Sequence, residues 1–599
     1  MTKTRQHPGS SPRESWGMAR PVPIDTGRVT KVSGPVVGAT DLPHTRLLDV
    51  VRVGTDRLLG EVIKIDGDLV VMQVFEDTTG LRVDEPVEAT GEPLYAELGP
   101  GLLGGILDGT QRRLEDLATD GDLYIARGAD PPRLDRDRRW DFRPAVGVGD
   151  RVSPGDVLGS VREGQAVEHR ILTPVDRSGV VTAIHPGPAT VVAPVVEIEG
   201  RPVTMLRRWP LRRPRPAANR LPLRVPLVTG QRVLDLLFPV ARGGSAIIPG
   251  GFGTGKTVLE QALAKFAMAD VVVYVGCGER GNELTEVLEQ FPELPDPRTG
   301  APLMERTVLI ANTSNMPVAA REASIYTGVT IAEYYRDQGY DVAMMADSTS
   351  RWGEALREVS SRLEEMPAED GYPAYLATRL AGFYERAGAV TCLGAPERTG
   401  SVTIVGAVSP AGGDFSEPIT QNSLRLAGCF WALDTALSRQ RHFPAVNWLR
   451  SFSQYDLDEW FGTEVADDWS LLRRWTAATL QAEGALQDVV SLLGIEALAP
   501  EQRITLRIGQ ALREDLLQQD SFDDVDASCS PGRLLAMLRV VHEAGAAMDA
   551  ALARGVPVTD ITEASALSEL GQMRRWAADA VEAAAARLTT RVVEEMRAL

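Results

Sequence analysis

A glycine-rich loop between a short apolar run and a helix-like segment constrains this chain more than any other feature. Residues 246–248 are apolar, and residues 250–257 read GGFGTGKT, which matches the pattern G-x-x-x-x-G-K-[ST] in full. Glycines let backbone N–H groups turn toward phosphate oxygens, and the N-terminus of a following helix adds partial positive charge. The strand-like and helix-like flanks argue against a chance glycine loop. The sequence therefore predicts a phosphate-binding P-loop.

The loop also predicts which side chains contact a nucleotide. We expect the Lys256 ammonium to reach the β- and γ-phosphates and the Thr257 hydroxyl to ligate Mg²⁺ that arrives with ATP or ADP. The candidate ATP-binding residues of the loop are Gly250, Gly251, Phe252, Gly253, Thr254, Gly255, Lys256, Thr257 and Val258.

Two further apolar runs lead to acids that suit the same chemistry. Residues 271–275 precede Glu279 and Arg280, and the run 341–347 ends in Asp347. Groups that follow parallel strands face the ligand of an open sheet. Glu279 is therefore a candidate to polarise the attacking water and Arg280 to balance charge, while Asp347 is a candidate to hold Mg²⁺ through water. The alternatives are a surface Glu-Arg pair that caps the next helix for Glu279, and a helix N-cap for Asp347.

The pattern of the whole chain indicates a multidomain α/β protein. Apolar runs of strand length alternate with helical segments over residues 204–446, which predicts a RecA-like parallel sheet with crossover helices. Short β-rich runs broken by Gly and Asp predict a small β-barrel over residues 26–88. Residues 89–203 continue the β pattern and predict a small sandwich or barrel. Apolar residues at three-four spacing predict a helical domain over residues 447–599.

The first residues and the composition add limits. Residues 1–25 are rich in Pro, Ser, Arg and Gly, so we expect a disordered tail, with translation starting at Met1 or at Met18. A net charge of −19 argues against a nucleic-acid partner. No run of about 18 apolar residues is present, so we expect no transmembrane helix. The four cysteines show no C-x-x-C spacing, and no zinc site or disulfide framework is indicated.

The motifs together resemble one family. GGFGTGKT followed by GCGERGNE resembles the catalytic A subunit, or alpha chain, of bacterial V-type/A-type rotary ATPases (ATP synthases). Further matches lie at residues 311–328, 344–388 and 412–421, and the resemblance covers nearly the whole chain after the first two dozen residues. The resemblance implies an ATP hydrolase or synthase coupled to H⁺ or Na⁺ transport. It also implies that Phe415, in GGDFSEP, lies against the adenine ring.

The resemblance implies partners as well. Three copies would alternate with three B subunits in an A3B3 hexamer, and an arginine from the B protein would complete each site. Residues 89–203 would form a bulge domain that contacts the peripheral stalk, and the helical domain would face the central rotor. The chain would be cytoplasmic, held at the inner face of the cell membrane by the complex with its ion-translocating sector.

Two other functions remain possible from the sequence. One is a non-catalytic, structural nucleotide-binding subunit of the same assembly; the presence of Lys256, Thr257, Glu279 and Asp347 argues against it. The other is a different ring ATPase, such as a secretion ATPase or an RNA helicase, and the acidic balance and the long insertion before the P-loop argue against that.

Overall fold

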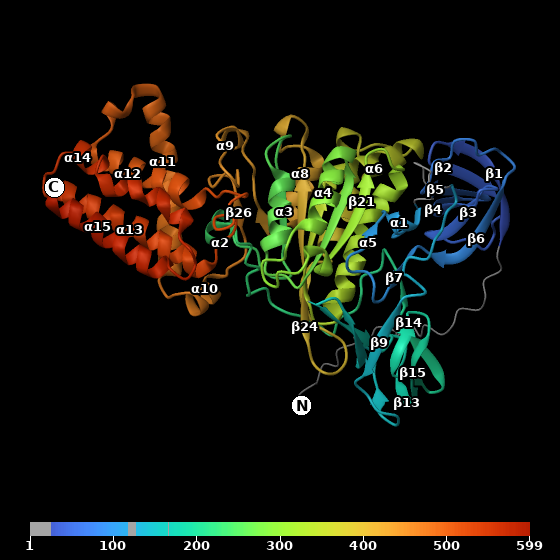
Figure 1. Cartoon of the computed structure of the whole chain (residues 1–599). Helices are drawn as coiled ribbons and strands as arrows, with labels where there is room; N and C mark the ends of the chain where they lie inside the picture. The colour runs from blue at the N-terminus through green and yellow to red at the C-terminus, as the bar shows by residue number, and fades with distance from the viewer. Residues whose placement is uncertain (1–24, 118–126, 166) are drawn as a thin grey trace, which may run out of the picture.

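The chain forms three bodies in a row, with a fourth set beside the row (Figure 1). A computed structural model describes residues 25–117, 127–165 and 167–599. A β-barrel lies at one end of the row, a sheet covered by helices at its centre and a helical body at the other end. The predicted fold class, with barrel, β-rich insertion, P-loop sheet and helical C-terminal region, is confirmed. The expected disordered tail and the choice between Met1 and Met18 lie outside the described residues.

The N-terminal body is a closed barrel with strand order β1-β2-β5-β4-β3-β6. Its interior is filled by small aliphatic side chains such as Val29, Val37 and Val51, all fully buried. Closure leaves no free edge, which suits short strands in a small domain. The strands are β1 Thr26–Ser33, β2 Val36–Thr40, β3 Asp49–Val53, β4 Leu58–Asp66, β5 Leu69–Val74 and β6 Pro86–Pro93.

The insertion is a sandwich of two four-stranded sheets, with orders β10-β13-β15-β16 and β12-β11-β9-β14. It is the body set beside the row in Figure 1. Trp140 and Phe142 alternate with exposed residues along β9 and enter its core. The strands are β9 Arg139–Pro144, β10 Arg151–Val152, β11 Val157–Glu163, β12 Val167–Leu172, β13 Gly179–Ile184, β14 Gly187–Thr190, β15 Pro194–Ile198 and β16 Arg201–Thr204. A two-stranded ribbon pairs β7 Tyr95–Leu98, which precedes the first strand of the central sheet, with β17 Arg207–Pro210, which follows the sandwich.

The central sheet has the order β26-β25-β19-β24-β22-β20-β21-β8, and β23 extends it off β24. Its core strands run parallel, as the alternation of apolar runs and helical segments predicts. The strands are β8 Ile106–Leu107, β19 Ser245–Pro249, β20 Val271–Glu279, β21 Thr307–Thr313, β22 Asp341–Asp347, β23 Gly388–Thr391, β24 Thr399–Val408, β25 Cys429–Phe430 and β26 Phe452–Ser453. Because β26 pairs with β25, the sheet includes residues that follow position 447.

Helices cover both faces of this sheet (Figure 1). They include α3 Lys256–Phe266, α4 Gly281–Glu293, α5 Val318–Asp337, α6 Thr349–Arg362, α7 Leu376–Tyr384 and α8 Pro418–Leu426. Helix α2 Arg232–Leu237 instead contacts helices of the C-terminal body, and α9 Thr435–Arg439 has no buried residue. Helix α5 is buried along almost its whole length. A Cβ on Gly328 would lie 2.5 Å from Cγ2 of Val275, so only glycine lets α5 approach β20 this closely.

The C-terminal body consists of helices, chiefly α10 Asp458–Glu464, α11 Trp469–Leu493, α12 Pro500–Gln510, α13 Pro531–Ala553, α14 Val558–Thr562 and α15 Val581–Ala598. Buried ion pairs tie the bodies together. Arg212 donates to Glu61 of the barrel at 2.7 Å and to Glu322 of α5 at 2.6 Å. Arg232 of α2 pairs with Asp526 of the C-terminal body at 2.7 Å. Losing one partner would leave an uncompensated buried charge, so these pairs fix how the bodies dock.

Within the described ranges, no helix has the length and apolar character needed to cross a bilayer. All four cysteines are buried and unpaired.

Candidate active site at the P-loop

The P-loop joins β19 to α3 and holds the Lys256 ammonium on its inner side. All five residues of β19 are buried, which anchors the start of the loop in the sheet. Nζ of Lys256 donates to the carbonyl oxygens of Gly250 and Gly251, each at 2.9 Å. From this position the ammonium can exchange the two carbonyls for phosphate oxygens without a change in the backbone.

Backbone conformation explains the glycines of the loop. Gly253 and Gly255 have φ angles of 75° and 89°, which side chains with a Cβ rarely adopt. A Cβ on Gly250 would lie 2.5 Å from the Thr254 hydroxyl oxygen. That hydroxyl donates to the Gly251 carbonyl oxygen at 2.8 Å and so closes the loop on itself.

Two predicted loop residues present their side chains to solvent. Phe252 is 78% exposed and Val258 is 41% exposed. Their backbone amides are therefore the groups that they can offer to a phosphate, as expected for a loop that recognises phosphate through main-chain N–H groups.

The two predicted metal residues touch each other. Asp347 ends β22, and the Thr257 hydroxyl donates to its Oδ2 atom at 2.8 Å. The Tyr274 hydroxyl donates to the same oxygen at 3.3 Å. Asp347 is 2% exposed, and burial raises the pKa of its carboxyl while Thr257 and Lys256 oppose that rise. One hydroxyl and one carboxylate at a helix start suit Mg²⁺, which keeps water and phosphate oxygens as its other ligands. Accordingly, the described residues contain no cluster of three or more metal-binding side chains.

Glu279 lies at the end of β20, at the same edge of the sheet as Asp347. Its strand is the direct neighbour of β22, and Gly276 stands opposite Asp347 in the parallel register. Burial raises the pKa of Glu279 to about 8, and the charges of Asp347 and Glu283 act in the same direction. A carboxyl group whose charged form is disfavoured in this way is typical of a functional site. A surface helix-capping acid would not be buried against two other acids.

Arg280 follows Glu279 but points elsewhere. Its guanidinium carbon lies 4.6 Å from the centroid of the Phe252 ring. The two side chains form a cation–π pair at the mouth of the loop. Arg280 could therefore balance charge in the site, as predicted, only after this cation–π contact is broken.

Phe415 lies beyond the end of β24, the strand that neighbours the P-loop strand. Its half-buried ring meets Phe430 edge to face at 5.9 Å, and Arg450 lies over the ring at 5.5 Å. Phe415 thus lies at the same edge of the sheet as the P-loop. Phe430 packs against its ring, and part of the Phe415 ring remains exposed.

Other arginines near the cleft have partners already. Arg351 pairs with Glu354 at 3.1 Å. Arg321, at the start of α5, donates to the Ser314 carbonyl oxygen at 2.9 Å. Gly278 lets both arginines approach β20, because a Cβ there would lie within 3 Å of each side chain.

Glu260 is a site residue that the sequence did not single out. It lies on α3 one turn after Lys256, is completely buried, and neither carboxyl oxygen has a hydrogen-bond partner among the described residues. Burial raises its pKa well above the usual value, and the charges of Asp347 and Glu279 add to the rise. An acid four residues after the P-loop lysine was the available signal, since i and i+4 share one helix face.

Glu260→Gln is expected to stabilise the nucleotide-free chain increasingly as pH rises. The raised pKa means that the folded chain keeps a proton on Glu260 that the unfolded chain releases above about pH 4.5. Stability is therefore full below that pH and is lost as pH rises toward the folded-state pKa. Removing a buried acid without partners should add about 1–3 kcal/mol to the free energy of unfolding near pH 8, and little near pH 4.5.

Melting midpoints of the variant and the parent chain at pH 6 and pH 8 test this. Glu289→Gln, at an exposed position on α4, is the control and should change neither midpoint. Equal midpoints of Glu260→Gln and parent at pH 8 would contradict the expectation.

Comparison with known protein families covers all four bodies. Residues 230–453 match the ATP synthase alpha/beta family, nucleotide-binding domain, and residues 29–91 match the beta-barrel domain of that family. Residues 131–212 match the ATP synthase alpha/beta subunit barrel-sandwich domain. Residues 458–553 match the C-terminal domain of V and A type ATP synthase.

Whole-length relatives agree with these matches. The chain is 56% identical to an A subunit of the A-type ATP synthase of Methanospirillum hungatei, over 92% of this chain and 94% of the relative. It is 53% identical to the A subunit of the A-type ATP synthase of Haloferax volcanii, over 96% and 98%. It is 54% identical to the V-type ATP synthase alpha chain of Thermoanaerobacter pseudethanolicus, over 90% and 92%. Archaeal relatives predominate, so the expected bacterial source stays a prediction.

Among solved structures, the assembled ATPase EscN of the enteropathogenic E. coli type III secretion system superposes with a TM-score of 0.61. The match covers 86% of this chain and 99% of that chain at 22% identity. At this identity the likeness shows a shared fold alone.

Proposed function

Because the chain belongs to the family of A subunits of A-type and V-type ATP synthases, we propose that the cleft at its P-loop is where ATP is hydrolysed or synthesised. The chain is the catalytic nucleotide-binding subunit of a rotary ATPase, and its reaction is coupled to ion transport. The observation that carries the site assignment is the 2.8 Å contact of Thr257 with Asp347, on a strand next to the one that ends in Glu279.

Each residue of the cleft has a distinct part in the proposal. The amides of residues 250–258 bind the phosphates, and Lys256 leaves the Gly250 and Gly251 carbonyls to bind the β- and γ-phosphates. Glu279 orients the water that attacks the γ-phosphate and accepts its proton. Phe415 supports the adenine ring by stacking.

The residues present fit Mg²⁺. Thr257 would bind the ion directly and Asp347 through water, and the ion would neutralise phosphate charge when bound. A cation there also favours the charged forms of Asp347 and Glu279, whose pKa values burial raises in the free chain.

The chain belongs to a multisubunit rotary ATPase, and the finer arrangement is part of the proposal. Three copies alternate with three B subunits, and the C-terminal helices face the central rotor while the sandwich domain faces the peripheral stalk. The complex holds the chain at the inner face of the membrane. The nearby arginines already contact partners within the chain: Arg280, Arg321 and Arg351. This supports the proposal that an arginine of the B subunit supplies further positive charge to the site.

The isolated chain is therefore expected to hydrolyse ATP at least about 10³-fold more slowly than the complex with its B subunits. This follows because a missing cationic contact to the γ-phosphate typically costs a factor of about 10³ to 10⁵. Phosphate release by the purified chain, by itself and after titration with the B protein, measures this. Full-rate hydrolysis by the monomer would contradict a site shared between subunits.

The rival functions are weakened by separate observations. A structural, non-catalytic subunit has no use for a half-buried Glu279 close to Asp347. A secretion ATPase shares the fold, but the relatives at more than 50% identity are ATP synthase subunits.

A further inference from the structure

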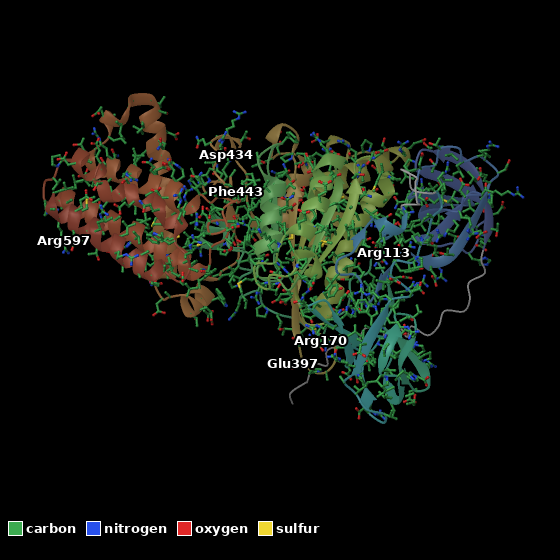
Figure 2. The ribbon with its side chains drawn as sticks, viewed as in Figure 1. Arg113, Arg170, Glu397, Asp434, Phe443 and Arg597 are labelled. Carbon is green, nitrogen blue, oxygen red and sulfur yellow. The ribbon has the colours of Figure 1, made fainter. Side chains whose placement is uncertain are left out.

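A second cavity lies far from the P-loop, at the junction of the sandwich domain and the central body. Its volume is about 1020 Å³. One wall comes from the sandwich side, at residues 171–178 and 205–210, and the other from the end of α5 and the loop before β24. Figure 2 labels Arg170 and Glu397 at this junction, on either side of the boundary. The size suits a small-molecule ligand.

The cavity is at the opposite edge of the sheet from the P-loop. Tyr334 and Asp337, in the last turn of α5, line it, and Arg398 stands just before β24 begins. The P-loop cleft instead lies where β20 and β22 end and where Arg321 opens α5. The helix rises by about 24 Å from Arg321 to Asp337. A ligand here therefore could not be the nucleotide bound at the P-loop.

The sandwich domain is held firmly at this junction, so the cavity has fixed walls. His169, completely buried on β12, contacts the Tyr334 hydroxyl at 2.8 Å and Glu163 at 2.5 Å. A Cβ on Gly394 would lie 2.2 Å from the Asp156 backbone nitrogen. This close backbone approach brings the loop before β24 against the sandwich domain.

Arginine dominates the lining. Six arginines and two aspartates face the cavity: Arg177, Arg207, Arg208, Arg213, Arg215, Arg398, Asp176 and Asp337. Arg215 is neutralised by Asp337 at 2.6 Å, and Arg208 by Glu92 at 2.9 Å.

Three of the other arginines contact no carboxylate within the described part of the chain. Arg177 donates to the Pro202 carbonyl oxygen at 2.6 Å. Arg398 donates to the carbonyl oxygens of Asp337, Gly155 and Leu393 at 2.8–2.9 Å. Carbonyl contacts orient a guanidinium without neutralising it, so the cavity keeps an excess of positive charge.

Arg207 shows this excess most clearly. Its Nη1 atom donates to the Leu206 carbonyl oxygen at 3.0 Å, whereas its buried Nη2 atom has no hydrogen-bond partner among the described residues. Burial lowers the pKa of Arg207 to about 10, and the charges of Arg177 and Arg215 act in the same direction. A buried guanidinium with a vacant donor is costly unless an anion completes it.

We propose that this cavity is a second anion site, which binds a compound carrying two or three linked phosphate groups. The planar forks of Arg177, Arg207 and Arg398 suit phosphate oxygens better than a point charge would. Three uncompensated guanidinium groups match the charge of a di- or triphosphate. The apolar part of the lining, which includes Leu172, Met205 and Leu393, leaves room for an organic group such as a nucleoside.

Calorimetric titration of the full chain with inorganic tripolyphosphate tests the proposal. Lys256→Ala is the host, so that binding at the P-loop is weakened while the junction is untouched. We expect tripolyphosphate to bind this host and to bind at least about 10-fold more weakly after Arg207→Met is added. Arg201→Met, at an exposed position on β16 outside the lining, is the matched control and should leave the affinity unchanged.

Two further titrations of the same host, with ATP and with citrate, identify the class of ligand. ATP without Mg²⁺ that binds the host more than 10-fold tighter than tripolyphosphate would identify a nucleotide, and equal affinity would identify the phosphate chain alone. Citrate binding as tightly as tripolyphosphate would overturn the assignment to phosphate. Tripolyphosphate binding that Arg207→Met leaves unchanged would overturn the site.

Arg207→Met should also fold. Replacing a guanidinium that has a buried, unsatisfied Nη2 atom by an apolar side chain removes a cost, so the ligand-free melting midpoint should stay equal or rise. A lower midpoint would show that Arg207 is a structural residue rather than a vacant anion ligand. Because the site is independent of the P-loop, its failure would leave the proposed function untouched.

Discussion

Replacing Lys256 with alanine is expected to abolish ATP turnover by the assembled complex while the chain stays folded. The ammonium is the cation that the chain itself places inside the P-loop, where two carbonyls hold it at 2.9 Å. Its loss removes charge stabilisation from both the bound nucleotide and the transition state. The rate should fall by about 10³-fold or more.

Lys265→Ala is the matched control for this experiment. Lys265 lies on the same helix, in its last turn, and packs over Phe266 at 4.9 Å. It should leave the rate within about twofold of the parent. Circular dichroism and the melting midpoint of both variants check the fold. Normal turnover with Lys256→Ala would remove the P-loop from the mechanism.

The sequence predicts the local parts of this site because each part is encoded over a few residues. A short apolar run, a glycine loop and an amphipathic segment specify β19, the P-loop and α3 without reference to the rest of the chain. The same holds for Glu279 and Asp347, each of which ends an apolar run. Such signals depend on local pattern, and the structure places these residues in one cleft.

Strand order depends on long-range pairing and was not predictable in the same way. The P-loop strand β19 pairs with β24, which lies about 150 residues later, and β20 is three strands away in the sheet. The Thr257–Asp347 contact, which joins residues 90 positions apart, follows from that order.

Burial is the second property that local pattern conceals. Glu260 has the spacing of an ordinary helix acid, and only the packing of α3 against β22 and β24 makes it a buried carboxyl beside the metal residues. Likewise the sequence does not show that the arginines between positions 207 and 215 line a cavity. The sandwich domain must dock before some of them enclose a cavity.

Glu279→Gln is expected to separate ATP binding from chemistry. The substitution keeps the size and hydrogen-bonding capacity of the side chain but removes the charge that orients and polarises the attacking water. The rate should fall by about two or more orders of magnitude. ATP affinity should be kept or rise slightly, because Lys256, Thr257 and the loop amides are unchanged and one repulsion with the γ-phosphate is lost.

The position of Glu279 supports this expectation over the helix-capping alternative. Its side chain is half-buried close to Asp347 and Glu283, and desolvation is the main cause of its raised pKa. Glu283 lies in the first turn of α4, where an acid favours the helix dipole. Because Glu283 itself acts on Glu279, the control is Glu289→Gln at an exposed position on the same helix, which should leave the rate within about twofold of the parent.

Single-turnover hydrolysis by the assembled complex, with a parallel nucleotide titration, distinguishes the possible roles of Glu279. Slow hydrolysis with tight ATP binding is the expected result, and it would leave the complex with ATP bound and the rotor stalled. A rate change below about twofold would make Glu279 a structural acid. If binding and rate were lost together, Glu279 would hold the metal or the loop instead, and the water would need another partner, for which the buried Glu260 is the nearest carboxyl on α3.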